Sequence, residues 1–180
     1  MPPIRNTTFS LLLALVLGGA IPPALADDAC LDFKWDVSKE RALFAGTPAV
    51  LTAGKDPRSA PVVVPDRFYK LRLNVQDRVV FSVSPARKPA TTTAFAGLAT
   101  LKIQVPGSYR IAVDLPLWMD VAANGSLVPA KDFQGQHSCD PPHKIVEFDL
   151  EAVRPFVLQF SNAPEASVLL TVTASPPRKY

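Results

Sequence analysis

The densest group of potential metal ligands in the sequence lies between His137 and His143, the two histidines of the chain. Imidazole and thiolate groups bind zinc, so His137, Cys139 and His143 are one candidate set. Two imidazoles with a carboxylate, Asp140 or Glu147, would instead suit non-haem iron. The alternative is a proline-rich loop with exposed histidines. His137 and His143 are therefore metal candidates, while we expect no cofactor.

A second candidate site is the pair Trp118 and Asp120. Their spacing places both side chains on one face of a strand, opposite Leu117, Met119 and Val121. An exposed indole can stack on a sugar ring while a carboxylate accepts hydrogen bonds from its hydroxyl groups. The pair is thus a candidate ligand-binding site. In the alternative interpretation a loop or a second sheet covers the tryptophan, and Lys144 pairs with Asp120 in a purely structural role.

Sequence signatures of catalysis are missing. The chain contains no G-x-S-x-G nucleophile motif and no glycine-rich phosphate loop, and neither cysteine resembles an activated thiolate. We therefore predict no catalytic residue.

The first 26 residues have the pattern of a secretory signal peptide. Arg5 precedes an apolar run from Phe9 to Ala20, and Ala24-Leu25-Ala26 supplies small residues for cleavage before Asp27. A membrane anchor would need a longer run of roughly 18 to 20 apolar residues. We therefore expect a periplasmic or secreted protein with no membrane span after cleavage.

Residues 27–180 have the length of a single domain. The net charge of +3 falls to +2 when the signal peptide, with its one arginine, is removed. No cluster of basic residues is present, so we expect no nucleic-acid partner. Cys30 and Cys139 both follow the cleavage site. In an oxidising compartment such a pair most often forms a disulfide, which is what we predict here.

Apolar residues alternate with polar ones along most of this domain, which predicts β-strands. Pro106-Gly107 and Asn124-Gly125 are turn signals that indicate two hairpins. Two Pro-, Ala- and Thr-rich segments, 45–61 and 84–95, are expected to be loops. The fold expected is an all-β, antiparallel β-sandwich, jelly-roll-like, of about eight or nine strands. These strands are predicted over residues 69–75, 79–83, 101–105, 109–113, 117–121, 126–128, 145–150, 156–160 and 168–172.

One segment departs from this alternation. Residues 36–44 place Val37, Arg41 and Phe44 on one side of a helix, with Gly46 as a signal for its end. We predict one short N-terminal helix that lies against a sheet.

Several short motifs resemble a family of small exported proteobacterial proteins of unknown function. They are distributed over nearly all of residues 27–180: Trp35-Asp36-Val37, Phe95-Ala96-Gly97-Leu98, Gly107-Ser108-Tyr109-Arg110, Trp118-Met119-Asp120-Val121, Asp132-Phe133-Gln134-Gly135, Cys139 and Lys144-Ile145-Val146-Glu147-Phe148. Members of that family are sometimes labelled homogentisate 1,2-dioxygenase. That likeness implies a metal-dependent enzyme as an alternative function, without assigning any catalytic residue. The Gly107–Arg110 turn and the strands after it are also similar to pre-peptidase C-terminal β-sandwich domains.

Together these observations predict an exported, non-catalytic binding or accessory protein of the cell envelope. Its partner would be a small molecule, a glycan or an envelope protein. A metal-dependent enzyme and a structural or partner-binding subunit remain as alternatives.

Overall fold

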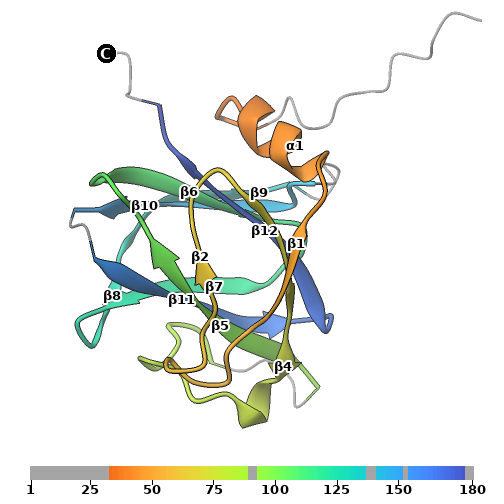
Figure 1. Ribbon diagram of the computed structural model, residues 1–180, viewed down its shortest axis with the longest axis vertical. Helices are drawn as coiled ribbons and strands as arrows, with labels where there is room; N and C mark the ends of the chain where they lie inside the picture. Colours follow the sequence, from red (N-terminus) through yellow and green to blue (C-terminus); the bar gives the residue numbers. More distant parts are fainter. Residues whose placement is uncertain (1–32, 89–92, 137–140, 152–153, 177–180) are drawn as a thin grey trace, which may run out of the picture.

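The computed structural model describes residues 33–88, 93–136, 141–151 and 154–176, and over these it is a two-sheet, mostly β structure with one α-helix (Figure 1). This confirms the predicted sandwich-like all-β fold, although with twelve strands rather than eight or nine. The helix is α1 (Ser38–Phe44). The strands are β1 (Ala49–Thr52), β2 (Val62–Val63), β3 (Phe68–Arg72), β4 (Asn74–Val75), β5 (Phe95–Lys102), β6 (Gly107–Val113), β7 (Trp118–Ala123), β8 (Ser126–Val128), β9 (Ala130–Gly135), β10 (Lys144–Leu150), β11 (Pro155–Ala163) and β12 (Ser167–Ala174).

The strands form two sheets, here called sheet A and sheet B. Sheet A has the order β1-β3-β12-β6-β10-β9, and sheet B has the order β2-β5-β11-β7-β8 with β4 beside β5. Most neighbours are antiparallel, but β1 pairs with β3 and β2 pairs with β5 in parallel. The last two strands of the chain therefore lie inside the sheets, β11 between β5 and β7 and β12 between β3 and β6.

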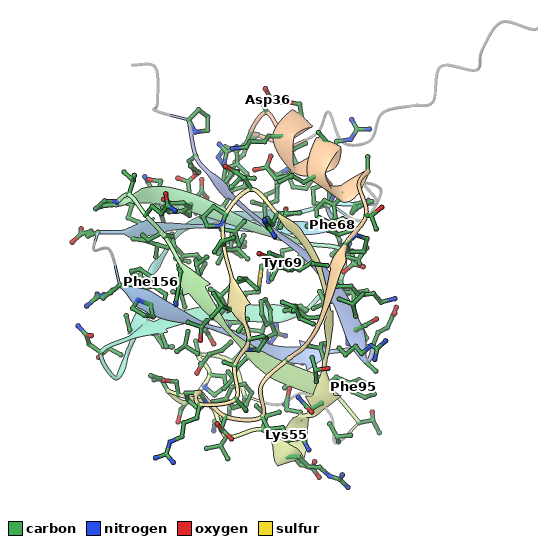
Figure 2. All side chains as sticks on the ribbon, viewed as in Figure 1. Asp36, Lys55, Phe68, Tyr69, Phe95 and Phe156 are labelled. Carbon is green, nitrogen blue, oxygen red and sulfur yellow. The ribbon has the colours of Figure 1, made fainter. Side chains whose placement is uncertain are left out.

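The main core lies between the two sheets. Alternate residues of each strand point inward, as in Tyr69 and Leu71 of β3 or Met119 and Val121 of β7. Figure 2 shows the labelled Tyr69 between the sheets, whereas its neighbour Phe68 points toward α1. Each fully buried large apolar side chain contributes roughly 1.5–3 kcal/mol. This burial holds the sheets face to face.

Helix α1 covers part of the outer face of sheet A (Figure 1). Phe44 meets Phe68 edge to face with ring centroids 5.3 Å apart, and Val37 packs in the same cluster. The predicted helix is thus present, but its buried face includes Glu40 rather than the exposed Arg41. The hydroxyl of Thr173 donates to one carboxylate oxygen of Glu40 over 2.5 Å, while the other oxygen is buried without a hydrogen-bond partner among the described residues.

A charged group surrounds Trp35 on the same outer face, and we call it the Trp35 cluster. The Cζ atom of Arg110 lies 5.0 Å from the centroid of the Trp35 ring, and the Nζ of Lys34 lies 4.8 Å from it. Both cations have carboxylate partners. Arg110 Nε contacts Glu147 Oε2 at 3.2 Å, and Lys34 Nζ contacts Asp132 Oδ1 at 2.5 Å. The Trp35 cluster is thus neutralised by two ion pairs.

A different kind of cover lies on the outer face of sheet B, where residues 76–88 cross it; we call this segment the strap (yellow-green in Figure 1). Its residues 79–83 were predicted to be a strand, and this prediction is wrong. Val83 bonds to the Gln159 side chain instead of to a strand backbone: its N–H donates to Oε1 over 3.1 Å and its carbonyl accepts from Nε2 over 3.0 Å. The side-chain amide thus replaces the neighbouring strand.

The two predicted hairpins have different outcomes. Asn124 and Gly125 adopt φ values of 52° and 72° and connect the antiparallel strands β7 and β8, as predicted. The hairpin expected around Pro106-Gly107 is wrong, because β5 belongs to sheet B and β6 to sheet A. Both strands direct apolar side chains into the core from opposite sides. The turn is an arch between sheets, and alternation alone does not distinguish an arch from a hairpin.

Candidate functional site

The best-formed candidate site surrounds Trp118 at the start of β7. As the sequence predicts, Trp118 and Asp120 share the outer face of the strand, whereas Leu117, Met119 and Val121 point into the core. The indole Nε1 of Trp118 donates to Asp120 Oδ1 over 3.0 Å. This bond ties the half-buried indole to the strand that carries it.

The strap completes the surroundings of Asp120. The backbone N–H of Ala86 donates to Asp120 Oδ2 over 3.1 Å, so each carboxylate oxygen accepts a hydrogen bond from the protein. Only 8% of the residue is exposed, and burial raises the pKa of its carboxyl group above the ordinary value, against the lowering effect of the Ala86 and Trp118 hydrogen bonds. The carboxylate that we expected to meet a ligand is thus engaged in holding Trp118 and the strap.

A hollow of about 280 Å³ opens beside the indole. Its walls come from four segments that are distant in sequence, and among its described lining residues none is acidic: Arg87, Pro116, Leu117, Trp118, His143, Lys144 and Asn162. Asn162 has a φ of 56° where the pairing of β11 with β5 becomes irregular. Its backbone N–H donates to Gln76 Oε1 over 2.6 Å, and its side-chain Nδ2 donates to the Lys88 carbonyl over 3.2 Å. Asn162 therefore connects the hollow to both ends of the strap.

Two cations lie against the Trp118 ring. The Nζ of Lys144 is 5.1 Å and the Cζ of Arg87 is 5.8 Å from the ring centroid, both within the range of a cation–π contact. Lys144 Nζ also donates to the Leu117 carbonyl over 2.9 Å. Burial, followed by the positive charge of Arg87, lowers the pKa of the Lys144 ammonium below its ordinary value, while Asp120 acts in the opposite direction. The site thus combines an aromatic surface with a local excess of positive charge.

The sequence prediction found part of this site. It named Trp118 and Asp120, and it named His143 as a metal candidate, which lines the same hollow. Lys144, considered there as a cross-strand partner of Asp120, comes from sheet A rather than from a strand beside β7. Arg87 and Asn162 were missed. Arg87 is placed by the path of the strap, for which the sequence gives no signal, whereas Asn162 is a residue type that favours a positive φ.

The structure describes only some of the other residues that the sequence analysis singled out. His137, Cys139, Asp140 and Cys30 lie outside the described residues, as does the predicted signal peptide. Within the described ranges no three His, Cys, Asp or Glu side chains are arranged to hold a metal ion. Glu147, the other carboxylate considered for iron, belongs to the Trp35 cluster, with Arg110 and Ser175 bonded to its Oε2.

Two larger hollows lie elsewhere among the described residues, but no tryptophan lines either of them. One of about 550 Å³ lies beside Ile103 and Val105, and the Tyr109 hydroxyl near it already donates to the Val105 carbonyl over 2.6 Å. Another of about 560 Å³ lies beside β8, and of its charged residues Lys131 and Asp149 pair with each other at 2.9 Å. Since a ligand is oriented by a few well-placed polar groups, the Trp118 hollow is the better candidate.

No protein-family model matches the chain, and the search of curated proteins returns no match. None of the helices among the described residues is long and apolar enough to cross a membrane.

Proposed function

We propose that this chain is an exported, non-catalytic binding protein of the cell envelope, and that its ligand site is the hollow beside Trp118. The observation that carries this proposal is the fixed indole. The indole donates a hydrogen bond to Asp120, and Asp120 in turn accepts one from the Ala86 N–H. Residues from both sheets and from the strap surround the ring. A rigid aromatic surface beside polar side chains is typical of sites that bind sugars or small ring compounds.

Fluorescence of Trp118 tests this proposal directly, because the chain has two tryptophans and Trp35→Phe leaves Trp118 as the single indole while keeping an aromatic ring at position 35. A Trp35→Phe variant would be titrated with a panel of neutral monosaccharides, oligosaccharides and sugar acids. We expect saturable changes in Trp118 emission with at least one class of compound. A panel without any saturable change would contradict a binding function at this hollow.

Export is the second part of the proposal, and it is supported by the charged, apolar and small-residue segments of residues 1–26. Fractionation of expressing cells should place the mature protein in the periplasm or medium, with Asp27 as its first residue. Full-length chain retained in the cytoplasm would contradict this part.

We further propose that Cys30 and Cys139 form a disulfide in the exported protein. The described residues near each of them support it, because the Lys34 N–H donates to Gln134 Oε1 over 2.9 Å. A residue four positions after Cys30 thus contacts a residue five positions before Cys139. Non-reducing mass spectrometry should show a protein two hydrogens lighter than after reduction. Labelling of free thiols in the native protein would contradict the bridge.

A further inference from the structure

The Trp118 hollow has more positive than negative charge. Arg87 and Lys144 carry two positive charges at the indole, and Asp120 is the carboxylate that acts on Lys144. Both oxygens of that carboxylate already accept hydrogen bonds, from Trp118 and from Ala86. Asp120 therefore reduces the local charge without occupying the donors that face the hollow.

Donor capacity also exceeds acceptor capacity. The Lys144 ammonium has three N–H bonds, and among the described residues one of them is directed to the Leu117 carbonyl. Arg87 is exposed at the rim and presents a planar guanidinium, which suits two-point contact with an oxyanion. The remaining donors are available to an acceptor that carries negative charge.

We propose that the hollow binds the oxyanion group of a small organic acid of monosaccharide size, such as a sugar acid. Arg87 and Lys144 donate to the oxyanion, and the ring of the ligand contacts Trp118. This inference rests on the proposed binding function and specifies its ligand class. A hollow of about 280 Å³ has room for a single ring with a carboxylate.

The decisive experiment compares two matched probes in the Trp35→Phe variant. Glucuronate and glucose differ in one carboxylate, and inorganic phosphate is an anion without a ring. We expect glucuronate to change Trp118 emission saturably and to bind at least about tenfold more tightly than glucose or phosphate. Replacing Lys144 with Met or Arg87 with Gln should weaken glucuronate binding by about tenfold each.

Lys88→Gln is the matched control, because Lys88 is an exposed cation on the same strap whose hydrogen bond with Asn162 involves only its backbone carbonyl. This variant should bind glucuronate as the parent does. Arg87→Gln alters an exposed side chain, so it remains a valid test if Lys144→Met does not fold. Equal binding of glucose and glucuronate would overturn the anion inference and leave the binding function intact. Absence of any response to glucuronate would also overturn this inference, whereas a silent full panel contradicts the binding function itself.

Discussion

The two tryptophans of the chain have similar neighbours but opposite electrostatic settings. Each indole has a lysine and an arginine against its ring, at 4.8 and 5.0 Å for Trp35 and at 5.1 and 5.8 Å for Trp118. At Trp35 both cations have carboxylate partners. At Trp118 the carboxylate of Asp120 is bonded to the indole and the strap instead. In the Trp35 cluster the cations pair with carboxylates of the protein. Beside Trp118 positive charge remains with which a ligand can interact.

The burial of the two arginines follows the same difference. Arg110 and Glu147 have side chains that are 8% and 4% exposed, which a charged pair tolerates only when both members are present. Arg87 lies exposed on the strap. A charge that must reach a ligand has to remain accessible, while a charge that stabilises the fold does not.

The largest loss of stability should come from removing Glu147, the carboxylate that pairs with Arg110 in the Trp35 cluster. Glu147→Ala leaves Arg110 buried without its carboxylate, and we expect a loss of about 3–5 kcal/mol in the free energy of unfolding. Urea denaturation measures it, with Arg87→Ala as the matched change at Trp118, expected within about 0.5 kcal/mol of the parent. If both variants lost the same stability, the two clusters would not differ in the way described.

The position of the strap on sheet B should depend on the side-chain amide of Gln159. Gln159→Leu leaves the Val83 N–H and carbonyl without their partner, at a cost of about 1–3 kcal/mol. Hydrogen exchange should show the Val83 amide losing protection while the sheets keep theirs. Gln104→Leu, at an exposed position in the arch between β5 and β6, provides the control. Unchanged protection at Val83 would mean that other contacts hold the strap.

The dependence of folding stability on pH tests the raised pKa of Asp120. Its folded-state pKa is raised, so between 3.8 and that pKa the folded protein binds a proton that the unfolded chain has lost. The stability of the parent relative to Asp120→Asn should therefore fall as the pH rises through this window, and then level off. Above it, Asp120→Asn should cost about 1 kcal/mol, because an amide has one acceptor for two N–H donors. Urea unfolding of both proteins from pH 3 to pH 7 gives this difference, and a difference that rises with pH would contradict the assignment.

The smallest effect is expected at the exposed ion pair of the Trp35 cluster. Lys34 and Asp132 have side chains that are 44% and 32% exposed, so solvent screens their attraction. Asp132→Ala should cost under about 1 kcal/mol, and the effect should shrink further in 1 M salt. A loss as large as that of Glu147→Ala would show that burial does not set the strength of these pairs.

Much of the fold could be predicted from local pattern. Alternation located most of the long strands, and Asn124-Gly125 located the β7–β8 hairpin, because two residues with positive φ suit that turn. Strands β1 and β9 escaped prediction because they lie at the edge of sheet A and are mostly exposed, which leaves little apolar alternation. Which strand joins which sheet depends on contacts across the core, so the arch after β5 could not be distinguished from a hairpin.

The candidate site was predictable only where it lies on one strand. The period of two places Trp118 and Asp120 on one face regardless of the tertiary fold. Arg87, His143 and Asn162 meet them through the strap, the segment just before β10 and an irregularity in β11, and no spacing along the chain encodes that meeting. The same holds for Gln159, a buried amide on β11, whose partner is a segment far away in sequence.

The strand order has a consequence for how the molecule is made. β11 and β12 come last in sequence yet lie between earlier strands in both sheets. A nascent chain that ends before Pro155 would have β5 and β7 apart in one sheet, and β3 and β6 apart in the other. Neither sheet can be completed until β11 and β12 have been made, and long-range pairing of this kind is slow. The export proposed above requires a chain that stays unfolded until its end has been made, and this topology delays completion of the fold until that point.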